Sequence, residues 1–116
     1  APVARLSAAA GATRLAVADA AAAVRDADGI VNTTPVGMAK YPGMPFPAGL
    51  LSARQWVADV IYFPAETELL RRAAALGCPT LPGIGMAIGQ AARAFELFTG
   101  RAADMAAMAH HFEAAA

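Results

Sequence analysis

The sequence is poor in the residues that build covalent, metal or charge-driven sites. Its single cysteine, Cys78, excludes an internal disulfide. With only His110 and His111 as partners for that thiol, the chain has no ligand set for a structural zinc, and we expect no metal site. Nine basic residues balance nine acidic ones, and the chain therefore lacks the excess of positive charge that nucleic acid or an acidic membrane attracts. We expect neither as a partner.

Long hydrophobic runs are also lacking, although 58% of the residues are hydrophobic. Alanine inflates this fraction, and it favours helix without demanding a membrane. The apolar stretches end at Arg, Asp or Gly well short of the roughly 18–20 residues that a bilayer requires. The first residues do not show the basic segment followed by a hydrophobic run that is typical of a signal peptide. These features predict a cytoplasmic protein of one modest domain, and the start at Ala1 without a methionine suggests a fragment or partial gene product.

The first half of the chain has the pattern of an α/β protein. Residues 15–18 are predicted as a strand, residues 20–27 as a helix and residues 29–33 as a buried parallel strand, which together would form one βαβ unit. Residues 34–55 contain too much proline and glycine for a long helix, apart from a turn near residues 48–51. Since ligands of open α/β sheets bind where parallel strands end, this connection is a candidate binding loop.

The second half continues the alternation. Residues 56–62 are predicted as a strand, a helix opens over residues 64–68 and runs to Leu76, and residues 79–81 form a short third strand. Helices are predicted over about residues 86–98 and 103–112, and the alanine tail at residues 114–116 should fray. The first of these helices is expected to turn one apolar side toward the protein, with the residues Ala91, Ala94, Phe95 and Phe98.

Polar groups and glycines follow the predicted strands. Asn32, Thr33 and Thr34 end one strand at the edge where a dinucleotide would lie, although such residues also serve simply to satisfy the backbone of a turn. Gly83 and Gly85 precede a helix start, where free N–H groups could receive an anion or a carbonyl oxygen, or where they form an ordinary loop.

Three further polar side chains are candidates for the functional site. Tyr62 should reach the edge that holds Asn32, either as a cleft residue or as ordinary packing. Gln90 lies in an otherwise apolar helix, so we expect a buried amide that has partners in the core or donates to a ligand hydroxyl. Asp59 lies within a strand, and a buried carboxylate must be paired or bonded to the backbone.

The chain offers no general acid–base pair. Lys40 lies in the proline-rich loop, and His110 and His111 lie near the carboxyl end, where a solvated helix is the simpler explanation. This segment therefore supplies binding groups rather than proton transfer.

Three motifs in register carry a family resemblance. They are DGIVNTTPVGM at residues 28–38, VADVIYFPAETELL at residues 57–70 and GIGMAIGQA at residues 83–91. Their order and spacing closely resemble those of shikimate and quinate/shikimate dehydrogenases, and AFELFTG at residues 94–100 is similar to the terminal helix of that family. The resemblance spans about residues 27–112.

The resemblance implies a partial fold and a set of roles. Residues 1–82 would form part of an NAD(P)-binding Rossmann domain with a parallel sheet, and residues 83–116 would form helices that border the substrate site and pack back toward a missing substrate domain. It implies that NADP or NAD contacts Asn32, Thr33, Thr34, Val60, Gly83 and Met86. It also implies that shikimate or quinate contacts Tyr62 and Gln90.

The implied activity is hydride transfer between the cofactor and 3-dehydroshikimate or 3-dehydroquinate, in aromatic amino-acid (chorismate) biosynthesis or quinate metabolism. The catalytic Lys–Asp pair and the glycine-rich pyrophosphate loop of the family would lie upstream of this chain, so no catalytic residue is predicted within it. A homodimer is possible in such an enzyme. The alternative is a non-catalytic nucleotide-binding or regulatory domain of the same fold.

Overall fold

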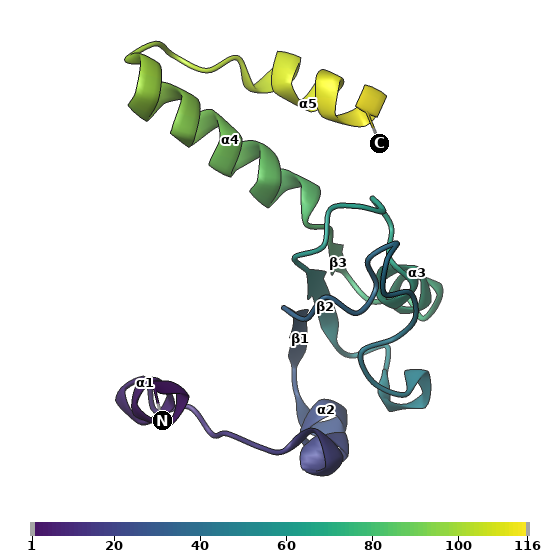
Figure 1. Cartoon of the computed structure of the whole chain (residues 1–116). Coiled ribbons are helices and arrows are strands. Elements are labelled where there is room, and N and C mark those ends of the chain that lie inside the picture. Colours follow the sequence, from purple (N-terminus) through teal and green to yellow (C-terminus); the bar gives the residue numbers. More distant parts are fainter. Residues whose placement is uncertain (1, 116) are drawn as a thin grey trace.

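The computed structural model describes residues 2–115 and shows an α/β chain with a small sheet (Figure 1). In chain order its elements are α1 (Pro2–Ala9), η1 (Val17–Asp19), α2 (Ala20–Asp26), β1 (Gly29–Asn32), η2 (Ala48–Leu50), β2 (Trp56–Asp59), α3 (Glu68–Ala75), β3 (Thr80–Leu81), α4 (Ile84–Thr99) and α5 (Met105–Ala115). None of the helices in residues 2–115 is both long and apolar enough to cross a membrane.

The sheet is parallel, and its strands lie in the order β1-β2-β3. Ile30 pairs with Val57 and Asn32 pairs with Asp59, while Val57 also pairs with Thr80. Because the strands are parallel, the carboxyl ends of β1 and β2 meet at one edge. This confirms the predicted sheet and brings Asn32 beside Asp59.

One face of the sheet is covered by α3 and by the long connection before β2. Leu51, Val57, Leu69, Leu70, Ala73 and Cys78 form a buried cluster, against which Ile30, Met44 and Phe46 pack. The other face is largely open, since Val31, Trp56 and Leu81 are exposed. Cys78 is a buried free thiol.

Buried Gln55 fastens α2 to the start of β2. Its Nε2 donates to the carbonyl oxygens of Val24 at 2.5 Å and Ala27 at 3.0 Å, and its Oε1 accepts from the N–H of Ser52 at 3.0 Å. The buried amide thus provides hydrogen-bond partners for two backbone carbonyls at the end of α2 and for one backbone N–H of the connection.

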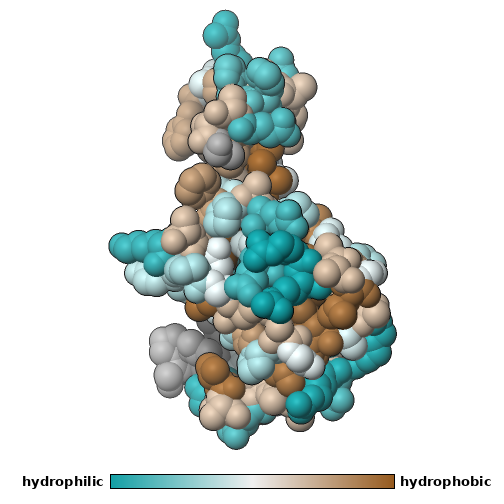
Figure 2. Space-filling view, turned by 90° about the vertical axis from the view of Figure 1, so that its right-hand side faces the viewer, coloured by the Kyte–Doolittle hydropathy of each residue, from teal (hydrophilic) through white to brown (hydrophobic). Residues whose placement is uncertain are grey.

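The last two helices form an arm that leaves the sheet. Helix α4 starts beside the sheet and runs away from it, and α5 returns along α4 (Figure 1). Gly100 ends α4 in the left-handed conformation, with φ of 67°, which allows the chain to reverse. Figure 2 shows the same arm as the narrow upper part of the molecule, with hydrophobic and hydrophilic side chains both reaching its surface.

Three predictions about the elements were wrong. The helix expected to open over residues 64–68 begins only at Glu68, after the N-cap Thr67. Residues 15–18 form no strand; the chain instead makes the 3-10 turn η1, and Val17 is 90% exposed. Alanines favour helical conformations over strands. Within residues 2–115 the outer edge of β1 stays unpaired, so the predicted βαβ unit is absent. The tail also stays helical in α5 through Ala115, whereas Ala116 lies outside the described residues.

The apolar side of α4 was also assigned incorrectly. Its buried residues are Ile88 and Ala92, while Ala91, Phe95 and Phe98 are exposed and Ala94 is half-buried. The helix packs on the described chain chiefly through α5, so only a narrow strip of it is covered.

Candidate functional site

A buried hydrogen-bond network joins the carboxyl ends of β1 and β2. Asn32 is 3% exposed and Asp59 is 2% exposed. The amide Nδ2 of Asn32 donates to both carboxylate oxygens of Asp59, at 3.2 and 3.3 Å, and to the carbonyl oxygen of Val36 at 3.0 Å. Its Oδ1 accepts from the N–H of Thr34 at 3.1 Å and from the Thr34 hydroxyl at 2.7 Å. Asn32 therefore fixes the turn that follows β1.

The same carboxylate holds the next two segments of the chain. Asp59 Oδ1 accepts from the N–H of Ile61 at 3.0 Å, and Oδ2 accepts from the hydroxyl of Thr67 at 2.8 Å. Thr67 is the N-cap of α3, and its oxygen also accepts from the N–H of Leu70 at 3.3 Å. The expectation that Asp59 needs partners is thus confirmed, and its partners come from three segments.

Two glycines bring further backbone to the end of β2. Gly37 has φ of +116°, and a Cβ on it would lie 3.2 Å from Cδ1 of Ile61. A Cβ on Gly83 would lie 2.4 Å from the carbonyl oxygen of Val60 and 2.6 Å from that of Ile61. The approach at Gly83 is possible only because glycine has no side chain, whereas Gly37 is required chiefly by its positive φ. The turn after β1, the end of β2 and the start of α4 therefore meet at one edge of the sheet.

Four of the predicted site residues border one cavity at this edge. The cavity has a volume of about 420 Å³ and is lined by Thr33, Thr34, Pro35, Met38, Val60, Ile61, Tyr62 and Phe63. Asn32 is not free to contact a ligand through its amide, because each polar atom of that side chain is already bonded within the protein. It shapes the site by holding Thr34.

The remaining predicted residues lie on α4. Gly83 is buried against β2, whereas Met86 is 43% exposed in the first turn and Gly85 is open to solvent. Gln90 is exposed, which corrects the expectation of a buried amide. Helix α4 runs away from the sheet (Figure 1), and Gln90 lies on an exposed side of it.

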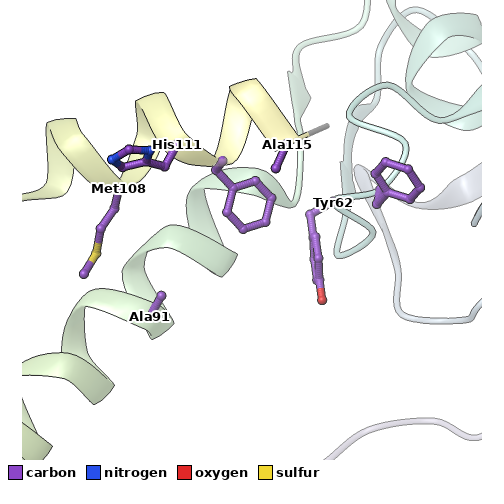
Figure 3. Close-up of a pocket in the computed structure, with 7 residues that line it drawn as sticks. Tyr62, Ala91, Met108, His111 and Ala115 are labelled. Atoms are coloured by element: carbon purple, nitrogen blue, oxygen red, sulfur yellow. The ribbon is translucent and has the colours of Figure 1, made fainter.

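A second cavity lies between Tyr62 and the arm. It has a volume of about 490 Å³ and is lined by Tyr62, Phe63, Ala91, Met108, His111, Phe112 and Ala115. Figure 3 shows Tyr62 beyond the end of α5, with Ala91 and Met108 facing the space between the two helices. The rings of Tyr62 and Phe112 pack edge to face, with centroids 5.6 Å apart. Tyr62 thus borders both cavities, and Gln90 precedes Ala91 of the second one.

The site can bind and orient but offers no proton-transfer pair. Lys40 lies over the ring of Tyr41, with Nζ 5.8 Å from the centroid, and the ion pairs found in residues 2–115 join arginines to surface carboxylates. His110 and His111 lie on α5 and are exposed. Within the described chain, no group of three or more His, Cys, Asp and Glu side chains could hold a metal ion.

Sequence reasoning missed three residues that shape this edge. Thr67 could have been recognised as the N-cap of α3, because threonine followed by an acidic residue is a common helix start. Gly37 has a positive φ. The prolines and glycines around it, such as Pro35 and Gly43, indicate a loop but do not single out this residue. The contact of Phe112 with Tyr62 joins residues that are distant in sequence, and no local pattern reveals it.

Comparisons with known proteins agree with this geometry. Residues 83–110 match the family model of the shikimate 5'-dehydrogenase C-terminal domain. Shikimate dehydrogenase (NADP(+)) of Streptomyces avermitilis is 65% identical over 79 residues, which are 68% of this chain and 27% of that protein. The chain thus spans about a quarter of that relative's length.

Solved structures show the same arrangement. Quinate dehydrogenase from Corynebacterium glutamicum, in complex with NAD, superposes with a TM-score of 0.84 at 43% identity, over 93% of this chain and 39% of that one. Shikimate 5-dehydrogenase from Thermus thermophilus, in complex with NADP(H) and shikimate, gives a TM-score of 0.78 at 32% identity, over 97% of this chain and 41% of that one. With its parallel Rossmann-type sheet and matching motifs, the chain belongs to the shikimate/quinate dehydrogenase family, whose carboxy-terminal domain it carries.

Proposed function

We propose that this chain forms the nicotinamide-side part of an NAD(P)-dependent shikimate or quinate dehydrogenase. The observation that carries the proposal is the meeting of three segments at one sheet edge: the turn after β1, the end of β2 and the start of α4. Dinucleotides bind at such edges in open α/β sheets. The relatives named for NADP(+), NAD, quinate and shikimate support this cofactor and substrate class.

The residues of the edge divide into two groups in this proposal. Thr33, Thr34, Val60, Gly83 and Met86 hold NADP or NAD, and Asn32 lines the groove by fixing the turn. When bound, the cofactor supplies or accepts the hydride, and this chain's own residues position its nicotinamide end. The missing side chain of Gly83 lets the start of α4 lie close to the end of β2, and the apolar side chains of Val60 and Met86 would border the nicotinamide end of the cofactor.

Tyr62 and Gln90 are the substrate-facing residues of the proposal. Shikimate and quinate carry several hydroxyl groups, and a phenol and an amide can exchange hydrogen bonds with them. The exposed position of Gln90 leaves its amide free for such a contact. The Lys–Asp pair that transfers the proton would lie outside this chain, as the family resemblance implies.

The direct test is an assay of the full-length protein that carries this chain. Shikimate and quinate would each be oxidised with NAD and with NADP, and reduced cofactor would be followed by absorbance. Activity with at least one combination is expected. Inactivity in all four, with cofactor binding retained, would favour a non-catalytic nucleotide-binding or regulatory domain. The homodimer and the cytoplasmic location remain predictions, which size-exclusion chromatography and cell fractionation would check.

The role of Gln90 has a sharper test. Gln90→Ala removes the amide but leaves the helix, since alanine favours helix. We expect the KM for shikimate or quinate to rise on the order of tenfold while the KM for the cofactor stays within about twofold. Equal changes in both would contradict the assigned role.

A further inference from the structure

We propose that Asp59 is a positioning residue for the cofactor, acting through the turn that follows β1. This inference rests on the proposed function, because it concerns the same groove. It goes further by assigning a task to a buried carboxylate that contacts neither cavity. Asp59 lies beneath the edge, and three of the residues proposed to hold the cofactor, Thr33, Thr34 and Val60, lie on the segments that it holds.

The geometry assigns each carboxylate oxygen a definite pair of donors. Oδ1 accepts from the N–H of Ile61 and the amide of Asn32, and Oδ2 accepts from the hydroxyl of Thr67 and the same amide. An ionised carboxylate accepts at both oxygens and donates at neither. The carboxylate of Asp59 can therefore accept all four of these hydrogen-bond contacts.

The hydrogen bonds continue from Asp59 to the proposed cofactor residues. With its Nδ2 held by Asp59, Asn32 presents Oδ1 to the N–H and hydroxyl of Thr34. The hydroxyl of Thr34 in turn accepts from the N–H of Val36 at 3.2 Å. The orientation of one buried amide thus decides the shape of the turn that lines the cavity.

An asparagine in place of Asp59 would disturb this turn selectively. Its single oxygen would stay with the N–H of Ile61, since a backbone donor cannot rotate. Its new NH2 group would face the hydroxyl of Thr67, which can turn to accept, and the NH2 group of Asn32, which cannot accept. The amide of Asn32 would keep its contact with the remaining oxygen, at 3.2 Å in the wild type, but it would lose its second acceptor and meet a donor in that place beneath the turn. The N–H groups of Ile61 and Leu70 would keep their acceptors. The effect should fall on the cofactor groove more than on Tyr62.

The test compares Asp59→Asn with Val57→Ala in the full-length protein. Val57 is fully buried in the same strand and lines neither cavity, so its truncation lowers stability without touching the network. For Asp59→Asn we expect the Kd of NADP or NAD, measured by calorimetry, to rise on the order of tenfold, with the cofactor KM rising in parallel and the substrate KM within about twofold. Val57→Ala should lower Tm and leave the Kd unchanged.

The outcomes separate the two proposals. A wild-type protein that neither binds nor turns over any combination of cofactor and substrate would overturn the proposed function. An active wild type whose Asp59→Asn variant loses Tm like Val57→Ala, with an unchanged cofactor Kd, would overturn the positioning role alone. Should Asp59→Asn not fold, Thr67→Val removes one donor at nearly constant shape. A cofactor Kd about threefold higher is then expected, and an unchanged one would refute the inference.

Discussion

Replacing Gly83 by alanine tests the convergence of the sheet edge most directly. Gly83 has φ of −71°, a conformation that alanine adopts freely, so the backbone itself imposes no penalty. The obstacle is space, because the added Cβ would lie 2.4 Å from the carbonyl oxygen of Val60 and 2.6 Å from that of Ile61. Both neighbours are backbone atoms at the end of a strand, and they cannot swing aside as a side chain would.

The expected magnitude follows from the size of the overlap. Ordinary contacts of a Cβ lie at 3.4–4 Å, so the start of α4 and the end of β2 would have to separate by about 1 Å. Overpacking of this kind costs about 1–3 kcal/mol, which lowers Tm by several degrees. A displacement of that size at a binding edge should also weaken cofactor binding on the order of tenfold or more.

Gly85→Ala supplies the matched control. It lies in the first turn of the same helix, and a Cβ there meets nothing within 4 Å. Alanine raises helix propensity by up to about 1 kcal/mol, so this variant should keep or gain stability and bind cofactor normally. Differential scanning calorimetry and titration of NADP or NAD would compare both variants in the full-length protein. A Gly83→Ala protein that matches Gly85→Ala in both measurements would refute the close approach of α4 to β2.

Two further substitutions examine contacts that define the site's surroundings. A Cβ on Gly29 would lie 1.8 Å from the ring of Trp56, but that ring is on the open face of the sheet and can move, so Gly29→Ala should cost only about 1–2 kcal/mol. The loss should vanish in a Trp56→Ala background, and additive effects in this double-mutant cycle would contradict the contact. Phe112→Ala removes an aromatic pair worth about 0.5–1.5 kcal/mol and should raise the substrate KM a few-fold by freeing Tyr62. Phe112→Tyr should behave as wild type, and a KM unaffected by Phe112→Ala would exclude this support for Tyr62.

The elements with strong local signals were predictable, and those that depend on distant partners were not. Strand β1 has β-branched residues between Gly and Pro, α3 has its N-cap and acidic first turn, and α4 ends at a glycine. Residues 15–18 were misjudged because a short apolar run does not distinguish a strand from a turn. The exposed amide of Gln90 could not be foreseen, since its burial depends on the direction in which the whole helix leaves the sheet.

The candidate site was recovered from motifs, whereas the forces that assemble it had to come from the structure. Asn32 was identified by its position at the end of a strand. Its amide is not available to a ligand, because it is hydrogen-bonded to Asp59 and Thr34. A sequence pattern reports which residue types occur at an edge, and it cannot report which of them bond to one another. The pairing register of β1 and β2 supplies that information, by placing Asn32 opposite Asp59.

The two halves of the site are held with different strength. The groove beside β1 and β2 is fixed by a buried core and by hydrogen bonds that satisfy every polar atom of Asn32 and both oxygens of Asp59. The arm is joined to it by the close contact at Gly83 and by the ring of Phe112, and its Phe98 is 90% exposed. Exposed apolar surface contributes nothing to holding the arm in place. Substitutions in the network should therefore alter cofactor binding first, and substitutions in the arm should alter the position of Tyr62 and Gln90 relative to the groove.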